Sequence, residues 1–123
     1  MIADGSRFSA ANWGQFADLG WLGLGIAEED GGFGGGPDEL RVLCEAFGRA
    51  LVVEPFVSTA VFAARAISLC EAGDLRAELL AGIIEGTLRF AVGHAEAAGR
   101  YDLQHIETRA VAKGNGFSLS GSK

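Results

Sequence analysis

The sequence has few basic residues and no dense run of them. Ten Lys and Arg stand against 16 Asp and Glu in a chain of 123 residues, which gives a formal net charge of −6 and an isoelectric point near 4.8. Nucleic-acid binding requires a basic patch, so this composition argues against it. No apolar run reaches the roughly 18 residues that a membrane span requires, and the first residues lack the layout of a signal peptide. We therefore expect a cytoplasmic protein that binds neither nucleic acid nor membrane.

Cysteine and histidine are also scarce. Cys44 and Cys70 lie 26 residues apart in predicted helices, and neither of the two histidines, His94 and His105, is near a cysteine. A structural zinc site requires four such ligands, usually at short spacings. We therefore predict no metal site, and we expect both cysteines to be reduced and buried as small apolar residues.

Glycine, in contrast, is abundant. The 19 glycines are about twice the usual share of roughly 7%, and they cluster in residues 20–36 and 114–121. The first cluster contains neither GxGxxG nor a Gly-Lys-Ser/Thr ending, so neither phosphate-binding fingerprint is present. We interpret it as a structural loop whose glycines adopt positive φ angles and whose apolar residues lie against the core.

Four segments have apolar residues at helical spacing, and each begins with a residue suited to a helix amino terminus. The third is apolar on both faces, which indicates a helix buried between neighbours. Together they predict a small helical bundle. The predicted helices span residues 10–19 with Ser9 as cap, 37–51 and 55–71 with a proline in the first turn, and 75–84 with Asp74 as cap.

The pattern changes after the fourth helix. Residues 88–92 alternate between apolar and other side chains, which predicts a strand. Residues 108–113 and 116–120 flank Gly114-Asn115, a tight-turn signal for a hairpin. Helices followed by strands favour the α+β class over an alternating βαβ arrangement.

We therefore predict two domains. Residues 1–86 form the helical bundle, and residues 87–123 form the opening strands of a β-barrel-like domain. The second predicted strand of the hairpin ends three residues before the end of the sequence. We therefore expect the sheet to be incomplete and the chain to be a piece of a larger protein.

Four motifs follow one another along the chain. They are Gly20-Trp21-Leu22-Gly23-Leu24 followed by Ala27-Glu28-Glu29-Asp30-Gly31-Gly32-Phe33-Gly34, then Glu45-Ala46-Phe47-Gly48-Arg49, then Glu96 and Asp102 with Thr108 and Ala110 after them, and finally Ser120-Gly121-Ser122-Lys123. By these motifs and their order the chain resembles the acyl-CoA dehydrogenase family, and the resemblance extends from about residue 12 to the end of the chain.

The resemblance implies an oxidoreductase. Members of that family use bound FAD to remove two hydrogens from the α and β carbons of an acyl-CoA, with a carboxylate as the base. The family's base lies in a carboxy-terminal helical domain, so no residue of this chain is predicted to be catalytic. We expect the longer protein to bind FAD, an acyl-CoA and an electron-transfer acceptor, and to form a homo- or hetero-oligomer. The piece alone is expected to be inert and not to retain FAD.

The resemblance also implies which residues contact the cofactor. The family's middle-domain loop supplies backbone and hydroxyl contacts to the flavin, which assigns Val92, His94, Ala95, Arg100 and Tyr101 to cofactor binding. Among these, His94 could bond the flavin ring or be a plain loop residue. Arg100 could meet a phosphate of FAD or CoA or be solvated, and Tyr101 could meet the flavin or the substrate.

This chain departs from the family's motif at four loop positions. Ala95 replaces a Thr, Ala97 replaces a Pro, and Arg100-Tyr101 replaces Gly-Ser before Asp102. These changes resemble a divergent branch that includes small subunits of heteromeric acyl-CoA dehydrogenases.

The remaining acidic residues have structural interpretations. Glu96 and Asp102 are expected to anchor the loop, and residues 28–30 to form a solvated acidic turn. Two alternative functions stay open. The chain could belong to a non-catalytic partner subunit of a heteromeric dehydrogenase. It could also be a helical interaction module without a ligand, whose apolar faces and open hairpin edge favour self-association.

Overall fold

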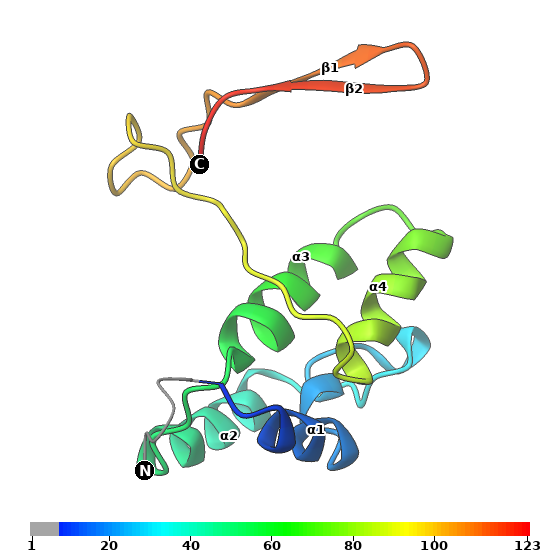
Figure 1. Ribbon diagram of the computed structural model, residues 1–123, viewed down its shortest axis with the longest axis vertical. Helices are drawn as coiled ribbons and strands as arrows, with labels where there is room; N and C mark the ends of the chain where they lie inside the picture. The colour runs from blue at the N-terminus through cyan, green and yellow to red at the C-terminus, as the bar shows by residue number, and fades with distance from the viewer. Residues whose placement is uncertain (1–7) are drawn as a thin grey trace. The chain divides into compact units, whose positions relative to one another are not determined.

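The computed structural model describes residues 8–123 and divides into two compact units, one ending at Ala91 and the other formed by Val92–Lys123 (Figure 1). The predicted α+β class is confirmed. The first unit contains the helices α1 (Ala10–Asp18), α2 (Pro37–Arg49), α3 (Ala64–Ser68) and α4 (Asp74–Ile84), the 3₁₀ turns η1 (Trp21–Gly23) and η2 (Glu28–Asp30), and the π-helix η3 (Val57–Ala63). The second contains the strands β1 (Arg109–Lys113) and β2 (Gly116–Ser120).

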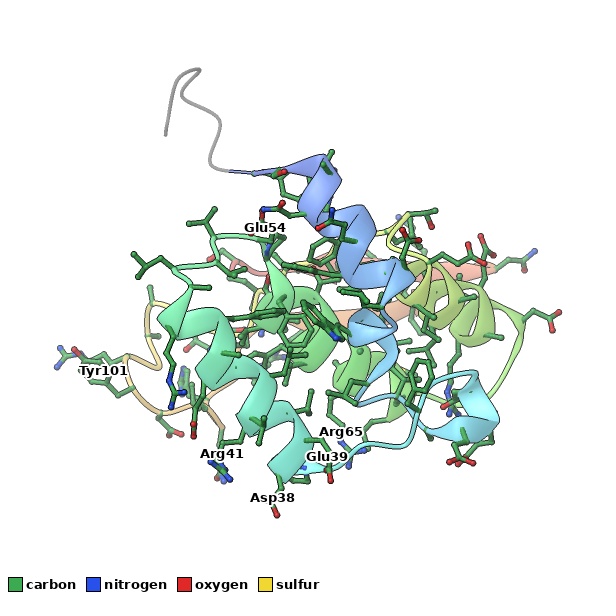
Figure 2. The ribbon with its side chains drawn as sticks, turned by 90° about the horizontal axis from the view of Figure 1, so that it is seen from below. Asp38, Glu39, Arg41, Glu54, Arg65 and Tyr101 are labelled. Atoms are coloured by element: carbon green, nitrogen blue, oxygen red, sulfur yellow. The ribbon has the colours of Figure 1, made fainter. Side chains whose placement is uncertain are left out.

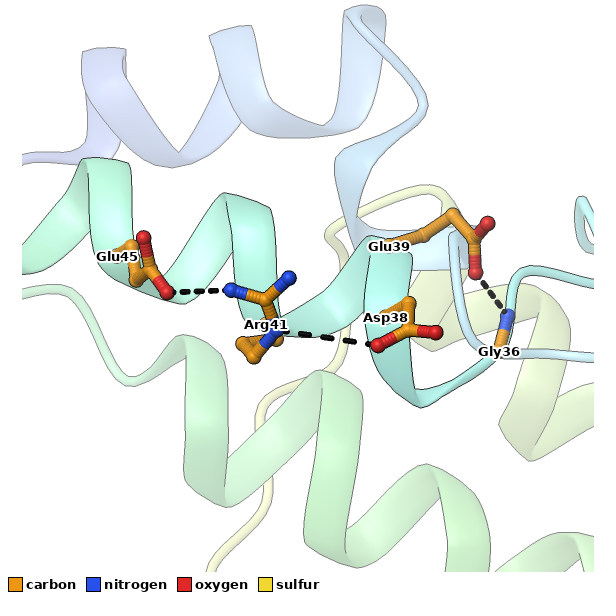
Figure 3. Close-up of polar contacts among 5 residues, drawn as sticks. All are labelled: Gly36, Asp38, Glu39, Arg41 and Glu45. Carbon is orange, nitrogen blue, oxygen red and sulfur yellow. Dashed lines mark hydrogen bonds and ion pairs between the residues drawn. The ribbon is translucent and has the colours of Figure 1, made fainter.

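Local sequence explains where α1 and α2 begin. The Ser9 hydroxyl accepts a hydrogen bond from the backbone N–H of Asn12 at 3.2 Å, as predicted for a helix cap. At α2 the Glu39 carboxylate accepts the backbone N–H of Gly36 at 2.8 Å (Figure 3). Pro37 occupies the first helical position, where its missing N–H costs nothing. Both helices therefore start at the residues that the sequence indicates.

The solvent face of α2 carries a ladder of ion pairs. The Arg41 guanidinium lies 2.6 Å from the Glu45 carboxylate and 3.8 Å from that of Asp38 (Figure 3). Glu45 also pairs with Arg49 at 3.7 Å. All four side chains are exposed, so each pair contributes at most about 0.5 kcal/mol to the helix.

The carboxyl end of α2 is closed by a leucine in an unusual conformation. Leu51 has a positive φ of 52°. Its N–H donates to the carbonyl of Gly48, and the N–H of Val52 donates to that of Phe47. This bond pattern is a Schellman motif, in which the residue at Leu51 is usually glycine. The turn ends the helix at Arg49, two residues before the predicted boundary at residue 51.

The third predicted helix, 55–71, is two pieces in the structure. Its first part is η3, in which the hydrogen bonds are wider than in an α-helix, and its second part, α3, ends at Ser68. Cys70 therefore lies beyond the helix and is exposed, so its predicted burial was wrong. Both cysteines are free thiols, as expected.

Helices α3 and α4 lie side by side and are joined by a short loop (Figure 1). Asp74 was predicted to cap α4 but lies within its first turn, and Gly73 occupies the cap position without a side-chain bond. An acid in the first turn still complements the positive end of the helix dipole.

Two clusters of buried residues form the core of the helical unit. Six aromatic side chains stack around the first, and the closest pair, Phe16 and Phe47, has ring centroids 4.8 Å apart. Phe90 and Ile84 pack against the second. The first cluster consists of Trp13, Phe16, Leu22, Phe56 and Ala60, and the second of Ile26, Ala64, Leu80 and Ile83.

The glycine-rich segment folds into tight turns around η1 and η2, and its glycines serve as predicted. Gly31 has a φ of 86°, and a Cβ on Gly32 would lie 2.2 Å from the carbonyl oxygen of Ile26. The predicted solvated acidic turn is wrong for Asp30, however. Its carboxylate pairs with Arg76 of α4, and the two side chains are only 16% and 20% exposed. This ion pair fixes the segment to α4.

Residues 88–92 are extended but are not part of a sheet, so the predicted strand is wrong. Side chains and turns of the helical unit supply the bonds instead. The Trp13 indole donates to the carbonyl of Gly86 at 2.9 Å. The Leu88 N–H donates to the carbonyl of Gly82 at 2.9 Å. Both backbone groups of Phe90 bond to the hydroxyl of Thr59 in η3. The segment is therefore held along η3 and α4.

The second unit contains the predicted hairpin. Strands β1 and β2 pair antiparallel, with Arg109 opposite Ser120 and Lys113 opposite Gly116. Gly114 has a φ of 60°, and Asn115 is not among the residues with positive φ, as in a type II′ turn. The register places Ala110, Ala112, Phe117 and Leu119 on one face. All residues of both strands are exposed, so this apolar face is unpaired in the described chain.

None of the described helices combines the length and the apolar character that a membrane-crossing segment needs.

Candidate functional site

A buried carboxylate organises the loop before β1. Glu96 is only 7% exposed. One of its oxygens accepts the backbone N–H of Glu107. The other accepts the N–H of Thr108 at 3.1 Å and lies 2.8 Å from the Lys123 ammonium. These contacts tie the start of the loop to its end and to Lys123, three residues after the end of β2.

The same contacts stabilise the charged form of Glu96. The hydrogen bond from Lys123 is the largest cause, and the bonds from Glu107 and Thr108 add to it, so that the pKa falls from 4.5 to about 2. A carboxylate with this pKa is a weak proton acceptor at neutral pH. The loop geometry therefore supports the anchoring role that the sequence suggested for Glu96.

A second carboxylate shapes the tip of the loop. Asp102 accepts the N–H of Gln104 at 2.9 Å, which forms an Asx-type turn. Its own N–H donates to the carbonyl of Gly99, and the N–H of Gly99 donates to that of Glu96. Asp102 thus bonds within the loop, which agrees with an anchoring role.

The structure divides the five predicted cofactor residues between two places. Val92, His94 and Ala95 lie in the extended stretch before Glu96, and Arg100 and Tyr101 lie in the turn after it. Tyr101 is 99% exposed and projects away from the loop ribbon (Figure 2). The five residues thus flank the Glu96 anchor on both sides.

Among the described residues, the backbone groups of residues 92–95 have no hydrogen-bond partner. Free N–H and C=O groups in an extended stretch can bind the edge of a flat heterocycle that alternates acceptors with an N–H donor, as the isoalloxazine ring of FAD does. A guanidinium such as that of Arg100 suits a phosphate. The donor set of this loop therefore fits a flavin nucleotide.

Arg100 has a positive φ of 50°. A side chain in this region of backbone space costs on the order of 1 kcal/mol relative to glycine. The backbone conformation at Arg100 therefore favours glycine. The family's motif, as described above, has glycine at this position.

Sequence reasoning missed one cluster beside this loop. The side chains of Glu96, His105 and Glu107 bring three ligand-type atoms within 4.8 Å of one another. His105 Nε2 lies 3.3 Å from the Glu107 carboxylate. However, the Lys123 ammonium already neutralises Glu96, so we assign no metal to the cluster. Lys123 is 27 residues from Glu96 in the sequence, so their pairing has no local sequence signal.

The helical unit has a cavity of about 360 Å³ between the end of α2 and the start of η3. Glu54 lines it and was also missed by the sequence reasoning. This buried carboxylate accepts hydrogen bonds from the side chain of Asn12 at 2.9 Å and from the N–H of Val53 at 3.2 Å. Glu54 therefore joins α1 to the segment before η3.

Comparisons with known proteins agree on one family. A family model described as the acyl-CoA dehydrogenase N-terminal domain matches residues 2–87. Acyl-CoA dehydrogenase FadE12 of Mycobacterium tuberculosis is 31% identical over 117 residues, which cover 90% of this chain and 29% of the relative. FadE29 of the same organism is 31% identical over 104 residues, which cover 85% of this chain and 27% of the relative.

One solved structure is similar along almost the whole chain. The Tcur3481-Tcur3483 steroid ACAD G363A variant superposes with a TM-score of 0.79 at 34% identity, and the match covers 97% of this chain and 32% of that one. This chain therefore spans less than a third of the length of these relatives.

Proposed function

The chain belongs to the acyl-CoA dehydrogenase family, and from this membership we propose that it supplies the amino-terminal part of an FAD-dependent acyl-CoA dehydrogenase. Residues 1–86 are its helical amino-terminal domain, and residues 87–123 begin its middle β-domain. The observation that carries the proposal is the unpaired extended stretch at residues 92–95, next to a buried anchor, in a chain that matches acyl-CoA dehydrogenases over 90% of its length.

The cofactor loop has distinct tasks in this proposal. Backbone groups of Val92, His94 and Ala95 hold the flavin edge, Arg100 pairs with a phosphate of FAD or CoA, and Tyr101 contacts the flavin or the substrate. Bound FAD supplies the acceptor for the hydride that leaves the β carbon of the acyl group. Glu96 stays ionised and keeps the loop in shape.

We propose, as the family resemblance implies, that the proton acceptor lies outside this chain. A base that removes the α proton requires a pKa near the working pH and access to the substrate. Glu96 has a pKa of about 2, and Glu54 is buried in bonds to Asn12 and Val53. We therefore expect the 123 residues alone to be inert and to release FAD, and the longer protein to be active.

The names of the relatives suggest which substrates and partners to test. One neighbour is named a steroid ACAD, so a steroid-derived acyl-CoA is a substrate class to test beside straight-chain acyl-CoA thioesters. The same name joins two components, Tcur3481 and Tcur3483, so a second polypeptide is a partner to test beside a homo-oligomer. An electron-transfer acceptor would reoxidise the flavin, and we place the protein in the cytoplasm.

The test compares the longer protein that contains these residues with the 123-residue chain. We expect the longer protein to purify with FAD and its flavin absorbance to bleach when an acyl-CoA is added without oxygen. Arg100→Met and Tyr101→Phe should weaken flavin or acyl-CoA binding, whereas Arg49→Met, on the exposed face of α2, should not. A longer protein that binds no flavin would refute the proposal. The comparisons do not favour the non-catalytic subunit or the ligand-free module over this proposal.

A further inference from the structure

Thr59 makes an unusual pair of contacts within the helical unit. Its hydroxyl donates a hydrogen bond to the carbonyl of Phe90 at 3.0 Å and accepts one from the N–H of Phe90 at 3.1 Å. The two residues are 31 positions apart, and Thr59 is 0% exposed. One side chain thus satisfies both backbone groups of a distant residue, as a neighbouring strand would.

The chemistry of this contact is specific to a hydroxyl. A hydroxyl offers one donor and an acceptor at a single atom, which complements the N–H and C=O of one residue. In a helix, a threonine hydroxyl commonly bonds a carbonyl of its own preceding turn. Thr59 lies in the π-helix η3 and bonds outward instead. Valine would fill the same space but leave both Phe90 groups without a partner.

The contact lies directly before the cofactor loop. Phe90 packs its ring against the second core cluster, so both its side chain and its backbone are held. Val92 follows two residues later, and its Cα is therefore at most about 7.6 Å from that of Phe90. From residue 92 to residue 95 the described backbone has no partner. Phe90 is thus the last fixed residue before the unpaired stretch.

We infer that Thr59 is a positioning residue for the flavin site: through Phe90 it fixes the point at which Val92–Ala95 leave the helical unit. The residue contacts neither cofactor nor substrate in this role. Its hydroxyl reduces the freedom of the extended stretch before the flavin binds, so that less conformational entropy is lost on binding. This inference rests on the proposed function, because it assigns Thr59 an effect on that same site.

The test uses Thr59→Val and Thr59→Ser in the longer protein that binds FAD. Two quantities are measured: hydrogen exchange of peptides that contain Phe90, and the FAD dissociation constant from a titration of the apoprotein. For Thr59→Val we expect about tenfold faster exchange at Phe90 and about tenfold weaker FAD binding, from the loss of two net hydrogen bonds. Thr59→Ser keeps the hydroxyl and should stay within about twofold of the wild type for both quantities.

Thr87→Val is the matched control. The Thr87 hydroxyl lies in the same connecting segment but donates to the carbonyl of Gly82 at 3.2 Å rather than to Phe90. This variant should leave the FAD dissociation constant unchanged. If Thr59→Val does not fold, Thr59→Ala provides a second variant without the hydroxyl, with the same expected losses.

The outcomes separate the two proposals. Unchanged exchange at Phe90 in Thr59→Val would overturn the inference, and so would faster exchange with unchanged FAD binding. A loss of FAD binding in Thr59→Ser equal to that in Thr59→Val would also overturn it, because the methyl group and not the hydroxyl would then matter. A wild-type protein that binds no FAD would refute the proposed function itself, and with it the role of Thr59.

Discussion

The Lys123 ammonium and the Glu96 carboxylate lie 2.8 Å apart, although 27 positions separate them in the chain. Their contact joins a residue three positions after the end of β2 to the start of the cofactor loop. The N–H groups of Glu107 and Thr108 complete the same anchor. Three groups from distant positions thus meet at one buried carboxyl group.

The first prediction concerns acid. Because the pKa of Glu96 is lowered from 4.5 to about 2, its ionised form stabilises the folded loop at neutral pH. This contribution is fully present above about pH 4.5 and is lost as the pH falls towards 2. The protection of the Glu107 and Thr108 amides from hydrogen exchange, relative to the intrinsic rate at each pH, should therefore fall over this range. Glu96→Gln should exchange faster at pH 7 and lack this transition. The same acid transition in the variant would contradict the assignment.

Leu51 provides the second prediction. It adopts a φ of 52° in the Schellman turn after α2 and is 83% exposed. Leu51→Gly should raise the free energy of unfolding by about 1 kcal/mol, because glycine adopts this conformation without the steric cost. Urea denaturation measures the change. Ala50→Gly is the control: it lies one residue earlier at a φ of −86° and should destabilise by about 0.5–1 kcal/mol. Destabilisation by Leu51→Gly would refute this account.

Arg100 provides a related prediction in the loop. Arg100→Gly removes both the guanidinium and the cost of a positive φ, whereas Arg100→Ala removes only the guanidinium. Amide exchange at Glu107 should therefore slow in Arg100→Gly relative to Arg100→Ala, by up to about tenfold for a difference near 1 kcal/mol. FAD binding should weaken equally in both variants if the guanidinium holds a phosphate. Equal exchange in the two variants would show that the loop carries no strain at this residue.

The fourth prediction concerns the ion pair of Asp30 and Arg76. Both side chains are mostly buried, so Asp30→Asn or Arg76→Gln alone leaves one charge without its partner. Each should destabilise the helical unit by about 1–3 kcal/mol. The double variant should cost less than the sum of the two, because neither charge then remains. Additive losses in this cycle would mean that the pair does not couple the glycine-rich segment to α4.

Two leucines of α4 allow a matched test of the core. Leu80 is fully buried and Leu75 is 67% exposed. Leu80→Ala should reduce the free energy of unfolding by about 2–5 kcal/mol through lost apolar contact and the cavity left behind. Leu75→Ala should change it by less than about 0.5 kcal/mol. Similar losses for the two variants would contradict the helix orientation.

The sequence was sufficient to predict elements whose signals are local. Ser9, Pro37 and the Gly114-Asn115 turn act through neighbouring residues, and the elements that they mark form where expected. A structural role was inferred for Glu96 because a lone carboxylate is weak evidence for a base, and the loop geometry agrees with that role. The assignment of flavin contacts stays a prediction, because it depends on groups beyond this chain.

The errors arose where distant contacts override local pattern. Residues 88–92 alternate like a strand, but Thr59 takes the place of a partner strand at Phe90. The sequence around Asp30 is typical of an exposed acidic turn, but its carboxylate pairs with Arg76, which lies 46 positions away. The prediction for the third helix assumes 3.6 residues per turn throughout. The wider turns of η3 change this period, and the helix ends before Cys70. None of these contacts has a signal within a short sequence window.

The distribution of aromatic residues has a practical consequence for spectroscopy. Both tryptophans, Trp13 and Trp21, belong to the helical unit, and the only tyrosine, Tyr101, belongs to the loop of the second unit. Selective excitation of tryptophan therefore reports unfolding of the helices alone. Iodide quenching of the exposed tyrosine reports events in the loop. The two units thus carry separate intrinsic optical probes, and their unfolding can be followed independently without an added label.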